Sequence, residues 1–223
     1  MRLSDSEELH QKITSASVIH IFGAGLNPEK PAHKAVYELS ERGWAVAPIR
    51  PRDAGATING FPIRPRLDDG LSPEIVVLFL APQRARDVVK SLILSQDHSK
   101  FPLIWFQHGA EDEEAISALE EMDAGYVIDD CIVVNSNTNG LVCTNTILPQ
   151  NWCLQIASKE GDGCSVWSVH SSESEDLEAP TTSLEWVGSL DDLKSSNHTI
   201  PRYIRSLKEE SETLLQLANR LAN

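Results

Sequence analysis

Two glycines and a lysine follow the first apolar run of the chain. Residues 18–22 are largely apolar and lead into Gly23-Ala24-Gly25, with Lys30 five residues further on. Small residues let a ligand approach the backbone closely, and the N–H groups at the start of a helix attract anions. Lysine can neutralise a phosphate as a point charge. These residues therefore predict a phosphate-binding turn between a strand and a helix.

The turn departs from the dinucleotide pattern G-x-G-x-x-G. Pro28 stands where that pattern has its third glycine, which allows close packing of helix on strand. A fold that binds NAD also ends its second strand with an acid, whereas here Ile49 is followed by Arg50. A nucleotide with an extra phosphate on its ribose fits these residues better than NAD does.

Arginines cluster after the second apolar run. Four of them, Arg50, Arg52, Arg64 and Arg66, accompany the single acid Asp53. A locally positive stretch on an acidic chain indicates a small polyanionic ligand, and Arg50 and Arg52 come directly after the strand. The other interpretation is that the arginines only neutralise neighbouring acids on a solvated surface.

The composition limits the classes of partner. The chain has 223 residues, 41% of them hydrophobic, and a formal net charge of -14. Such acidity argues against nucleic acid and anionic membranes, because both require a basic face. No stretch approaches the roughly eighteen unbroken apolar residues of a membrane helix, and residues 1–14 lack the apolar core of a secretory signal. We therefore expect a cytoplasmic protein.

Short apolar runs alternate with helical stretches in the first part of the chain. The runs are residues 18–22, 44–49, 74–80, 102–106 and 124–134, and the helical stretches are 30–43, 82–96 and 111–122. Near-continuous apolar strands separated by helices predict a parallel sheet covered on both faces. The expected fold is α/β, a doubly wound and mostly parallel Rossmann-like sheet, with residues 59–63 adding a short strand. Its ligand should lie beyond the carboxyl ends of the strands.

The remainder of the chain has a different composition. We expect four segments: an N-terminal helix in 1–14, the Rossmann-like domain in 15–134, a β-rich extension with an acidic linker in 135–183, and a helical segment in 184–223. Three short antiparallel strands are expected in 140–148, 151–158 and 164–171. The linker 171–183 has little to bury. The helix predicted for 200–223 packs on its own domain or pairs two chains.

Several residues that could do chemistry have a structural explanation instead. The four cysteines form no C-x-x-C pair, so we interpret them as reduced and mostly buried thiols, and no metal site is expected. His108 has no acidic partner assignable from the sequence, and the acids at 111–114 suit the first turn of a helix. No catalytic residue is predicted.

The chain resembles a known family in several ordered stretches. These are GAGLNPEKPAHKAVYEL, VAPIRPR, GFPIRPRLDD, WFQHGAEDEEAISALEE and VIDDCIVV. Over roughly residues 15–134 they are similar to the CoA-binding domain family, stand-alone Rossmann-like proteins similar to the N-terminal domain of the succinyl-CoA synthetase alpha subunit. The most specific parts are the N-P-x-K-P entry to the first helix and the W-x-Q-x-G run at 105–109.

The resemblance implies a ligand, coenzyme A or an acyl-CoA, and a set of contacts. The implied cofactor-binding residues are Gly23, Ala24, Gly25, Lys30 and His33 around the phosphates, Arg50, Pro51 and Arg52 at the adenosine, Ala81 and Pro82 along the adenine and pantetheine path, and Gln107 and Gly109 after the fourth main strand. The family's loop after the second strand usually reads V-N-P-K, whereas this chain has I-R-P-R at 49–52. Many members have F-R-x-P in a later loop, where this chain has F-L-A-P at 79–82.

Residues 135–223 do not resemble the ligase parts that carry the phosphorylated histidine or the ATP-grasp partner. The resemblance therefore implies CoA binding without ligase catalysis, with a small nucleotide ligand as the partner. The apolar spacing of the C-terminal helix separately allows a homodimer through the C-terminal region. Two alternatives stay open. One is an NAD(P)-dependent oxidoreductase that uses the same turn, and the other is an interaction protein whose nucleotide pocket has decayed.

Overall fold

A computed structural model describes residues 1–4, 6–146 and 148–222, and the chain divides into two compact units. Unit 1 comprises Met1–Pro48 and Ser72–Ile147, and unit 2 comprises Ile49–Leu71 and Leu148–Asn223. The second unit thus combines a stretch from the middle of the chain with the C-terminal part. Among the described residues, no helix has the length and apolar character needed to cross a membrane.

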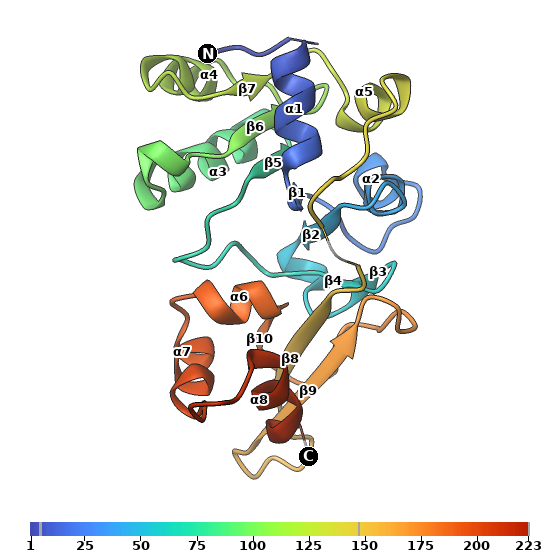
Figure 1. Cartoon of the computed structure of the whole chain (residues 1–223), viewed down its shortest axis with the longest axis vertical. Coiled ribbons are helices and arrows are strands. Elements are labelled where there is room, and N and C mark those ends of the chain that lie inside the picture. Colours follow the sequence, from blue (N-terminus) through green and yellow to red (C-terminus); the bar gives the residue numbers. More distant parts are fainter. Residues whose placement is uncertain (5, 147, 223) are drawn as a thin grey trace. The chain divides into compact units, whose positions relative to one another are not determined.

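Unit 1 is built on a five-stranded sheet with the order β2-β1-β5-β6-β7 (Figure 1). Its strands are β1 (Val18–Phe22), β2 (Ala45–Ile49), β5 (Ile75–Leu78), β6 (Leu103–Phe106) and β7 (Tyr126–Val127). The pairs β1–β5, β5–β6 and β6–β7 are parallel. Strands β2, β5 and β6 are buried along their whole length, as the apolar runs predicted. The doubly wound α/β fold is therefore confirmed.

Helices cover both faces of this sheet. They are α1 (Glu7–Ser15), α2 (Pro31–Ser40), α3 (Pro82–Ser95), α4 (Glu113–Glu121) and α5 (Ile132–Thr138), with a short 3-10 helix η2 (His98–Lys100). Helix α3 contacts α4 on one face and α2 contacts α5 on the other, as Figure 1 shows. Helix α1 begins after Ser6, whose hydroxyl accepts a hydrogen bond from the Leu9 N–H. The predicted N-terminal helix also included Asp5, which lies outside the described residues.

The last predicted strand of this unit, 124–134, is wrong over most of its length. Strand β7 covers only Tyr126–Val127, and Asp129 adopts a left-handed backbone with φ 60°. The Asp130 carboxylate accepts hydrogen bonds from the Cys131 N–H at 2.7 Å and the Asn135 side chain at 2.8 Å. This polar turn ends the strand and starts α5, so the β-branched run after it is helical.

The strand predicted for 140–148 is not formed in the described part of that segment. Its backbone instead bonds to helix ends elsewhere in unit 1: Cys143 N–H donates to the Arg42 carbonyl at 3.0 Å and Thr144 N–H donates to the Thr14 carbonyl at 3.0 Å. Position 147, within the same prediction, lies outside the described residues. The segment is therefore a loop that is hydrogen-bonded to the C-terminal ends of α1 and α2.

Unit 2 contains a small antiparallel sheet of order β10-β8-β9 and a hairpin, β3–β4. The strands are β3 (Thr57–Ile58), β4 (Phe61–Pro62), β8 (Asn151–Ala157), β9 (Ser165–Ser171) and β10 (Leu184–Ser189), with a 3-10 helix η1 (Pro51–Asp53) and helices α6 (Leu190–Ser195), α7 (Thr199–Ser206) and α8 (Leu214–Leu221). The β-rich extension is confirmed. Strand β10 was missed, since residues 184–223 were predicted to be helical.

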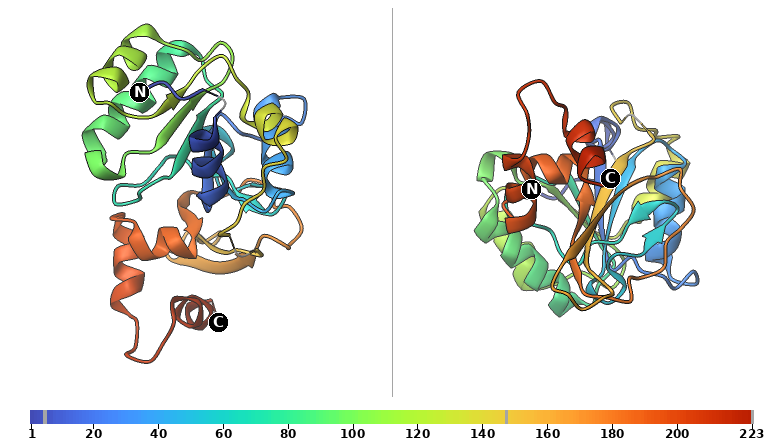
Figure 2. Two further views of the ribbon diagram at one scale, coloured as in Figure 1. Left: turned by 45° about the horizontal axis from the view of Figure 1, so that its top comes forward. Right: turned by 90° about the horizontal axis from the view of Figure 1, so that it is seen from below.

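Each face of the small sheet has its own core. On one face Cys153 and Trp186 pack with Leu193, Ile204 and Leu217 of the three helices, which Figure 2 shows on one side of the sheet. On the other face the core consists of Trp152, Leu154 and Val187, with Ile156, Leu177 and Leu184 packed against it. Each face therefore carries an apolar cluster, and a hydrophobic face or packing against a helix is what lets a three-stranded sheet be stable.

The acidic segment 171–183 contains no buried residue, as its prediction as a linker with little to bury implies, but it is attached to the hairpin of this unit. Its Asp176 carboxylate accepts hydrogen bonds from the Thr57 hydroxyl at 2.8 Å and the Gly60 N–H at 2.7 Å, both in the hairpin. Gly60 has φ 75°, and a Cβ there would lie 2.0 Å from the Ser172 carbonyl oxygen. Hairpin and segment are thus packed backbone to backbone.

The single helix predicted for residues 200–223 is two helices. Helix α7 ends at Ser206 and α8 begins after Thr213, whose hydroxyl accepts from the Gln216 N–H while the Gln216 side chain accepts from the Thr213 N–H. This T-x-x-Q capping box is a helix start signal present in the sequence. Residue 223, the end of the prediction, lies outside the described part.

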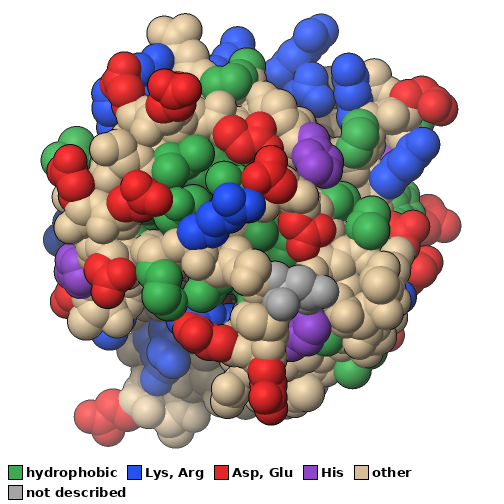
Figure 3. Space-filling model, turned by 90° about the horizontal axis from the view of Figure 1, so that it is seen from above, with side chains coloured by type: hydrophobic (Ala, Val, Ile, Leu, Met, Phe, Trp, Pro, Cys, Tyr) green, Lys and Arg blue, Asp and Glu red, His purple; other side chains and the backbone are tan. Residues whose placement is uncertain are grey.

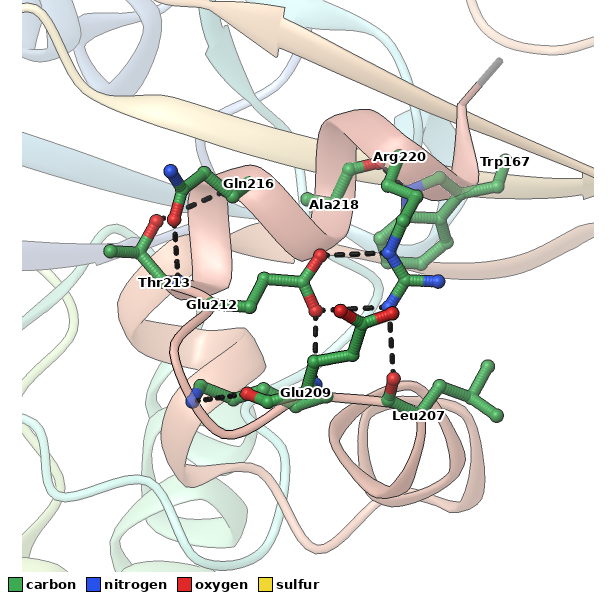
Figure 4. Close-up of polar contacts among 9 residues, drawn as sticks. Trp167, Leu207, Glu209, Glu212, Thr213, Gln216, Ala218 and Arg220 are labelled. Atoms are coloured by element: carbon green, nitrogen blue, oxygen red, sulfur yellow. Dashed lines mark hydrogen bonds and ion pairs between the residues drawn. The ribbon is translucent and has the colours of Figure 1, made fainter.

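The corner between α7 and α8 is held by Arg220 and Glu212 (Figure 4). Arg220 Nε and Nη2 donate to the two Glu212 carboxylate oxygens at 2.8 Å and 2.9 Å, and Nη2 also donates to the Leu207 carbonyl at 2.9 Å. The hydrogen bond from Arg220 lowers the pKa of Glu212 to about 2. The indole N–H of Trp167 donates to the Ala218 carbonyl at 3.1 Å and attaches α8 to β9.

We expect the stability of this corner to fall in acid. Since the folded pKa of Glu212 lies below its ordinary value of 4.5, its contribution is fully present above pH 4.5 and is lost as the pH falls towards about 2. Glu212→Gln should therefore destabilise the protein at neutral pH and make little difference near pH 2. Urea unfolding of both proteins across this range tests it, with the exposed Glu210→Gln as control. An equal effect of Glu212→Gln at both ends of the range would contradict the assignment.

Candidate functional site

The strand order of unit 1 reverses between β1 and β5. From β1 the chain runs outward to β2 on one side, and the later strands β5, β6 and β7 continue on the other side. In open parallel sheets ligands bind beyond the carboxyl ends of the strands at this reversal. The segments that follow β1, β5 and β6 are therefore the ones that form the candidate site.

The glycine turn after β1 owes its first glycine to packing. Gly23 has φ 95°, and a Cβ there would lie 2.3 Å from the Phe79 carbonyl oxygen, just beyond β5. Ala24 and Gly25 are buried. The close approach that the sequence suggested for a ligand is thus made at Gly23 by the neighbouring strand.

Pro28 belongs to a turn rather than to the helix. The Lys30 N–H donates to the Asn27 carbonyl at 3.1 Å, and the Asn27 side chain accepts from the Glu29 N–H at 3.0 Å. Proline at the second position of such a turn is favourable because its φ is already set. The helix begins only at Pro31, so the third glycine of the dinucleotide pattern has no equivalent position here.

The N-terminus of α2 has no side-chain cap. Lys30 is the N-cap residue, its side chain makes no capping hydrogen bond, and the first turn contains no acid. Lys30 is exposed and has no ion pair among the described residues. The His33 ring lies 5.5 Å from the Tyr37 ring, and its Nδ1 lies 2.8 Å from the Gly25 carbonyl oxygen, which ties the first turn of the helix to the glycine turn.

The N-terminus of α3, after β5, has the same character. Ala81 is its N-cap residue without a side-chain cap, Pro82 follows at the first helical position, and the first turn has no acid. Arg84, in that first turn, is exposed and has no ion pair in the described part of the chain. A cation at the positive end of a helix dipole is unfavourable unless an anion lies nearby.

Arg84 is not among the residues predicted for the site, although the sequence contains a signal for it. A basic residue in the first turn of a helix without an accompanying acid is unusual, and α2 is similar in having the basic Lys30 as its N-cap residue and no acid in its first turn. By contrast, Arg86 two residues on is paired with Glu114 and lies 3.5 Å from Asp112. Arg84 is therefore the basic residue of this segment that is free to meet a ligand.

The N-terminus of α4, after β6, is closed by acids. The Asp112 side chain accepts from the Ala115 N–H at 3.0 Å, and Glu113 and Glu114 lie in the first turn. The hydrogen bond from Arg86 lowers the pKa of Glu114. The interpretation of this acidic run as a dipole-stabilised helix start is confirmed, and an anion should not bind here.

Gln107 and Gly109 lie on the segment between β6 and α4. Gln107 is 5% exposed and, among the described residues, its Nε2 has no hydrogen-bond partner. The Gly109 N–H donates to the Glu111 carboxylate at 2.7 Å, so a side chain of the protein already occupies that donor. His108 beside them is exposed. The buried amide of Gln107 is thus the polar group of this segment with unused hydrogen-bonding capacity.

The arginine-rich stretch lies in unit 2 and is largely paired. Arg50 lies 3.3 Å from Asp53, Arg66 lies 3.6 Å from Asp68, and Arg64 is buried against Asp192. Arg50 and Arg66 thus each lie beside an acid close in sequence, as the alternative interpretation expected, whereas Arg64 is buried against a distant one. The assignment of Arg50 to a ligand stays a prediction. Pro51 and Arg52 are exposed in η1, and Arg52 has no ion pair in the described part of unit 2.

The cysteines are less buried than predicted. Cys153 is buried, and burial raises the pKa of its thiol to about 12, so it is unreactive. Cys131, the N-cap residue of α5, and Cys143 are half-buried, and Cys164 is exposed. Within the described residues, no group of three or more His, Cys, Asp or Glu side chains is arranged to hold a metal ion.

One face of the molecule can be seen directly in Figure 3. Acidic side chains are spread over it, and several Lys and Arg side chains gather towards the right, the side on which Figure 1 draws α2 and α5. Helix α2 begins after its N-cap residue Lys30 and carries the exposed Lys34 in its first turn. The charge on this acidic chain is thus unevenly distributed.

Comparison with known proteins relates this arrangement to a family. A family model described as CoA binding domain matches residues 17–137. A structure described as cell-free ID.343 from Thermus thermophilus is similar at 29% sequence identity with a TM-score of 0.54, over 61% of this chain and 98% of that one. A hypothetical protein from Pyrococcus horikoshii OT3 is similar at 25% identity with a TM-score of 0.53, over 61% and 92%. No curated protein matches the chain.

Proposed function

We propose, from the premise that this chain belongs to the CoA binding domain family, that unit 1 binds coenzyme A or an acyl-CoA at the carboxyl ends of β1 and β5. One observation carries the proposal. The helices on either side of the strand-order reversal, α2 and α3, both begin without a side-chain cap or an acid, whereas α4 begins with Asp112 as its cap and two acids.

A helix N-terminus without a cap or an acid offers its free N–H groups and the positive end of its dipole to an anion. Lys30 and Arg84 add a full positive charge at the two starts, and neither has an ion pair among the described residues. A diphosphate carries charge at two adjacent positions, which matches two adjacent cationic helix starts. We assign Lys30 and Arg84 to the diphosphate of the ligand.

The remaining candidates of unit 1 have supporting rather than charged roles. Gly23, Ala24 and Gly25 form the turn that leads to α2, and His33 holds that turn through the Gly25 carbonyl. The apolar residues Ala81 and Pro82 are exposed at the start of α3, where they suit the uncharged part of the ligand. Their assignment, and that of the buried Gln107 amide as a donor to the ligand, forms part of the same proposal.

Ligand-induced stabilisation tests the proposal. Coenzyme A, acetyl-CoA, NAD, NADP and ADP are added in parallel, and a ligand at a hundred times its dissociation constant should stabilise the protein by about 2.7 kcal/mol. We expect the CoA species to raise the melting temperature more than the others do. Stabilisation by NAD or NADP alone would favour an oxidoreductase, and no stabilisation by any of them would mean that the pocket has lost its ligand.

The variant Lys30→Ala/Arg84→Ala tests the residues. Loss of two charge-assisted contacts should weaken CoA binding at least about tenfold, measured by calorimetric titration. The control Lys90→Ala/Lys100→Ala removes the same charge from exposed positions of unit 1 and should leave the affinity unchanged. Equal weakening by both variants would reduce the role of Lys30 and Arg84 to general electrostatics.

A further inference from the structure

Strand β9 forms one edge of the three-stranded sheet in unit 2. The order β10-β8-β9 leaves β9 paired on one side only, with β8, in an antiparallel register that joins Cys153 to Val169 and Gln155 to Trp167. An edge strand presents N–H and C=O groups that can pair with another strand. The groups that point outward can be identified from the register.

The hydrogen bonds that flank the pairing show which residues of β9 face β8. Ser172 N–H donates to the Gln150 carbonyl at 2.9 Å, and Ser158 N–H donates to the Cys164 carbonyl at 2.8 Å. Since backbone groups alternate along a strand, the even-numbered residues of β9 face β8 and the odd-numbered ones face outward. The Ser171 groups are used by a turn, because its carbonyl accepts from the Ser174 N–H and its N–H donates to the Ser174 hydroxyl.

Three residues therefore have outward N–H and C=O groups with no hydrogen-bond partner in the described chain, namely Ser165, Trp167 and Val169. They are the alternate residues at the centre of the strand. Their side chains point to the face covered by the helices, where Trp167 and Val169 pack against the core. The edge is thus supported by a rigid layer behind it.

The edge also lacks the features that normally prevent pairing. Natural edge strands carry Lys, Pro or bulges, whereas residues 163–172 contain no charged residue and no proline. Ten uncharged residues in a row matter on a chain of net charge -14, because β9 itself contributes no carboxylate to a contact between two copies. An acid near this edge is Glu185 of β10, whose carboxylate accepts a hydrogen bond from the Ser165 hydroxyl at 2.7 Å.

We propose that a second copy of this chain pairs with β9, antiparallel and about a two-fold axis at Trp167. In this register Ser165 lies opposite Val169 of the second copy, and Trp167 lies opposite Trp167 of the second copy. The two strands then satisfy every outward group of these three residues, and the two sheets become one six-stranded sheet. A C2 interface must be self-complementary in this way, which an unrelated partner strand need not be.

The register predicts the contacts on the opposite face of the sheet. There Val166, 49% exposed, lies opposite Ser168 of the second copy, and Ser168 lies opposite Val166 of the second copy. Two lysines at these positions would face two lysines, whereas one lysine and one glutamate would face their opposites. A lysine–lysine variant should therefore repel its copy and a lysine–glutamate variant should attract it, although the two differ at one residue only.

The molar mass of the full chain in solution, measured by sedimentation over a range of concentrations, is the first readout. We expect self-association to twice the chain mass of 24.6 kDa. Val166→Lys/Ser168→Lys should weaken the association at least about tenfold, and Val166→Lys/Ser168→Glu should associate as tightly as the natural chain or more tightly. Circular dichroism and the melting temperature establish that both variants fold.

The proposal is overturned if the natural chain stays monomeric throughout, or if both folded variants associate like the natural chain. It is also overturned if both variants become equally monomeric while folded, because this pairing keeps the lysine–glutamate variant dimeric. A nucleotide ligand is absent from all these measurements, so the result does not depend on the function proposed for unit 1.

Discussion

Replacing Arg64 with methionine should cost unit 2 about 3–5 kcal/mol of stability, because it leaves a buried carboxylate without its counter-charge. The Arg64 and Asp192 side chains are 5% and 12% exposed. One carboxylate oxygen of Asp192 accepts from Arg64 Nε at 2.7 Å and Nη2 at 2.6 Å, and from the Ser189 N–H at 2.8 Å. Arg64 comes from the middle stretch of the chain, so the pair joins that stretch to α6.

Two further variants test whether the loss comes from the unpaired buried carboxylate rather than from the removal of an arginine as such. Arg66→Met removes an arginine that is 67% exposed and should change stability by less than about 1 kcal/mol. Arg64→Met/Asp192→Leu replaces both charges and should be less destabilised than Arg64→Met alone. Urea unfolding measures the free energies, and hydrogen exchange of the β8 amides, compared with those of β5, locates the loss in unit 2. If Arg66→Met were as damaging as Arg64→Met, burial of the pair would not be the reason.

Long-range pairs such as this one limit what the sequence can predict. The arginines at 50, 64 and 66 formed a positive strip when only their neighbours were considered, and that favoured a polyanion. Arg64 meets an aspartate 128 positions away, and no local pattern contains this information. The sheet of unit 1 was predictable for the opposite reason, since strands buried along their whole length show near-continuous apolar runs.

Local signals were present for some of the errors. The turn at Asp129 and Asp130 and the T-x-x-Q sequence at Thr213 are both local, but the first was overridden by the strand preference of the β-branched residues after it, and the second lies within a sustained apolar period. For the candidate site, Lys30 was predicted from its neighbours. Arg84 was not, because its significance depends on where α3 begins and on which basic residues nearby have partners.

The charged helix starts and the glycine turn of the candidate site differ in how strongly a substitution affects folding. The starts of α2 and α3 are exposed, so Lys30 and Arg84 can be replaced with little effect on folding. The glycine turn is part of the packing of β1 against β5. A test of ligand binding should therefore change the charged residues, whereas a change in the turn reports on the sheet.

Gly23→Ala is accordingly expected to destabilise unit 1 by more than about 3 kcal/mol. A left-handed backbone costs a non-glycine residue of order 1–3 kcal/mol, and the new Cβ would lie 2.3 Å from the Phe79 carbonyl oxygen. Such a contact forces β1 and β5 apart, which adds the cost of overpacking. Urea unfolding gives the loss, and hydrogen exchange should show it in β1 and β5.

Gly109→Ala is the matched control for this substitution. Gly109 also has a left-handed backbone, with φ 83°, but no atom lies within 4 Å of its added Cβ. Only the cost of holding alanine in a left-handed backbone conformation should appear, of order 1–3 kcal/mol. The difference between the two variants therefore isolates the close approach of the strands. Equal losses would mean that β1 and β5 can separate without cost, and the small residue after β1 would then have to be explained by the ligand instead.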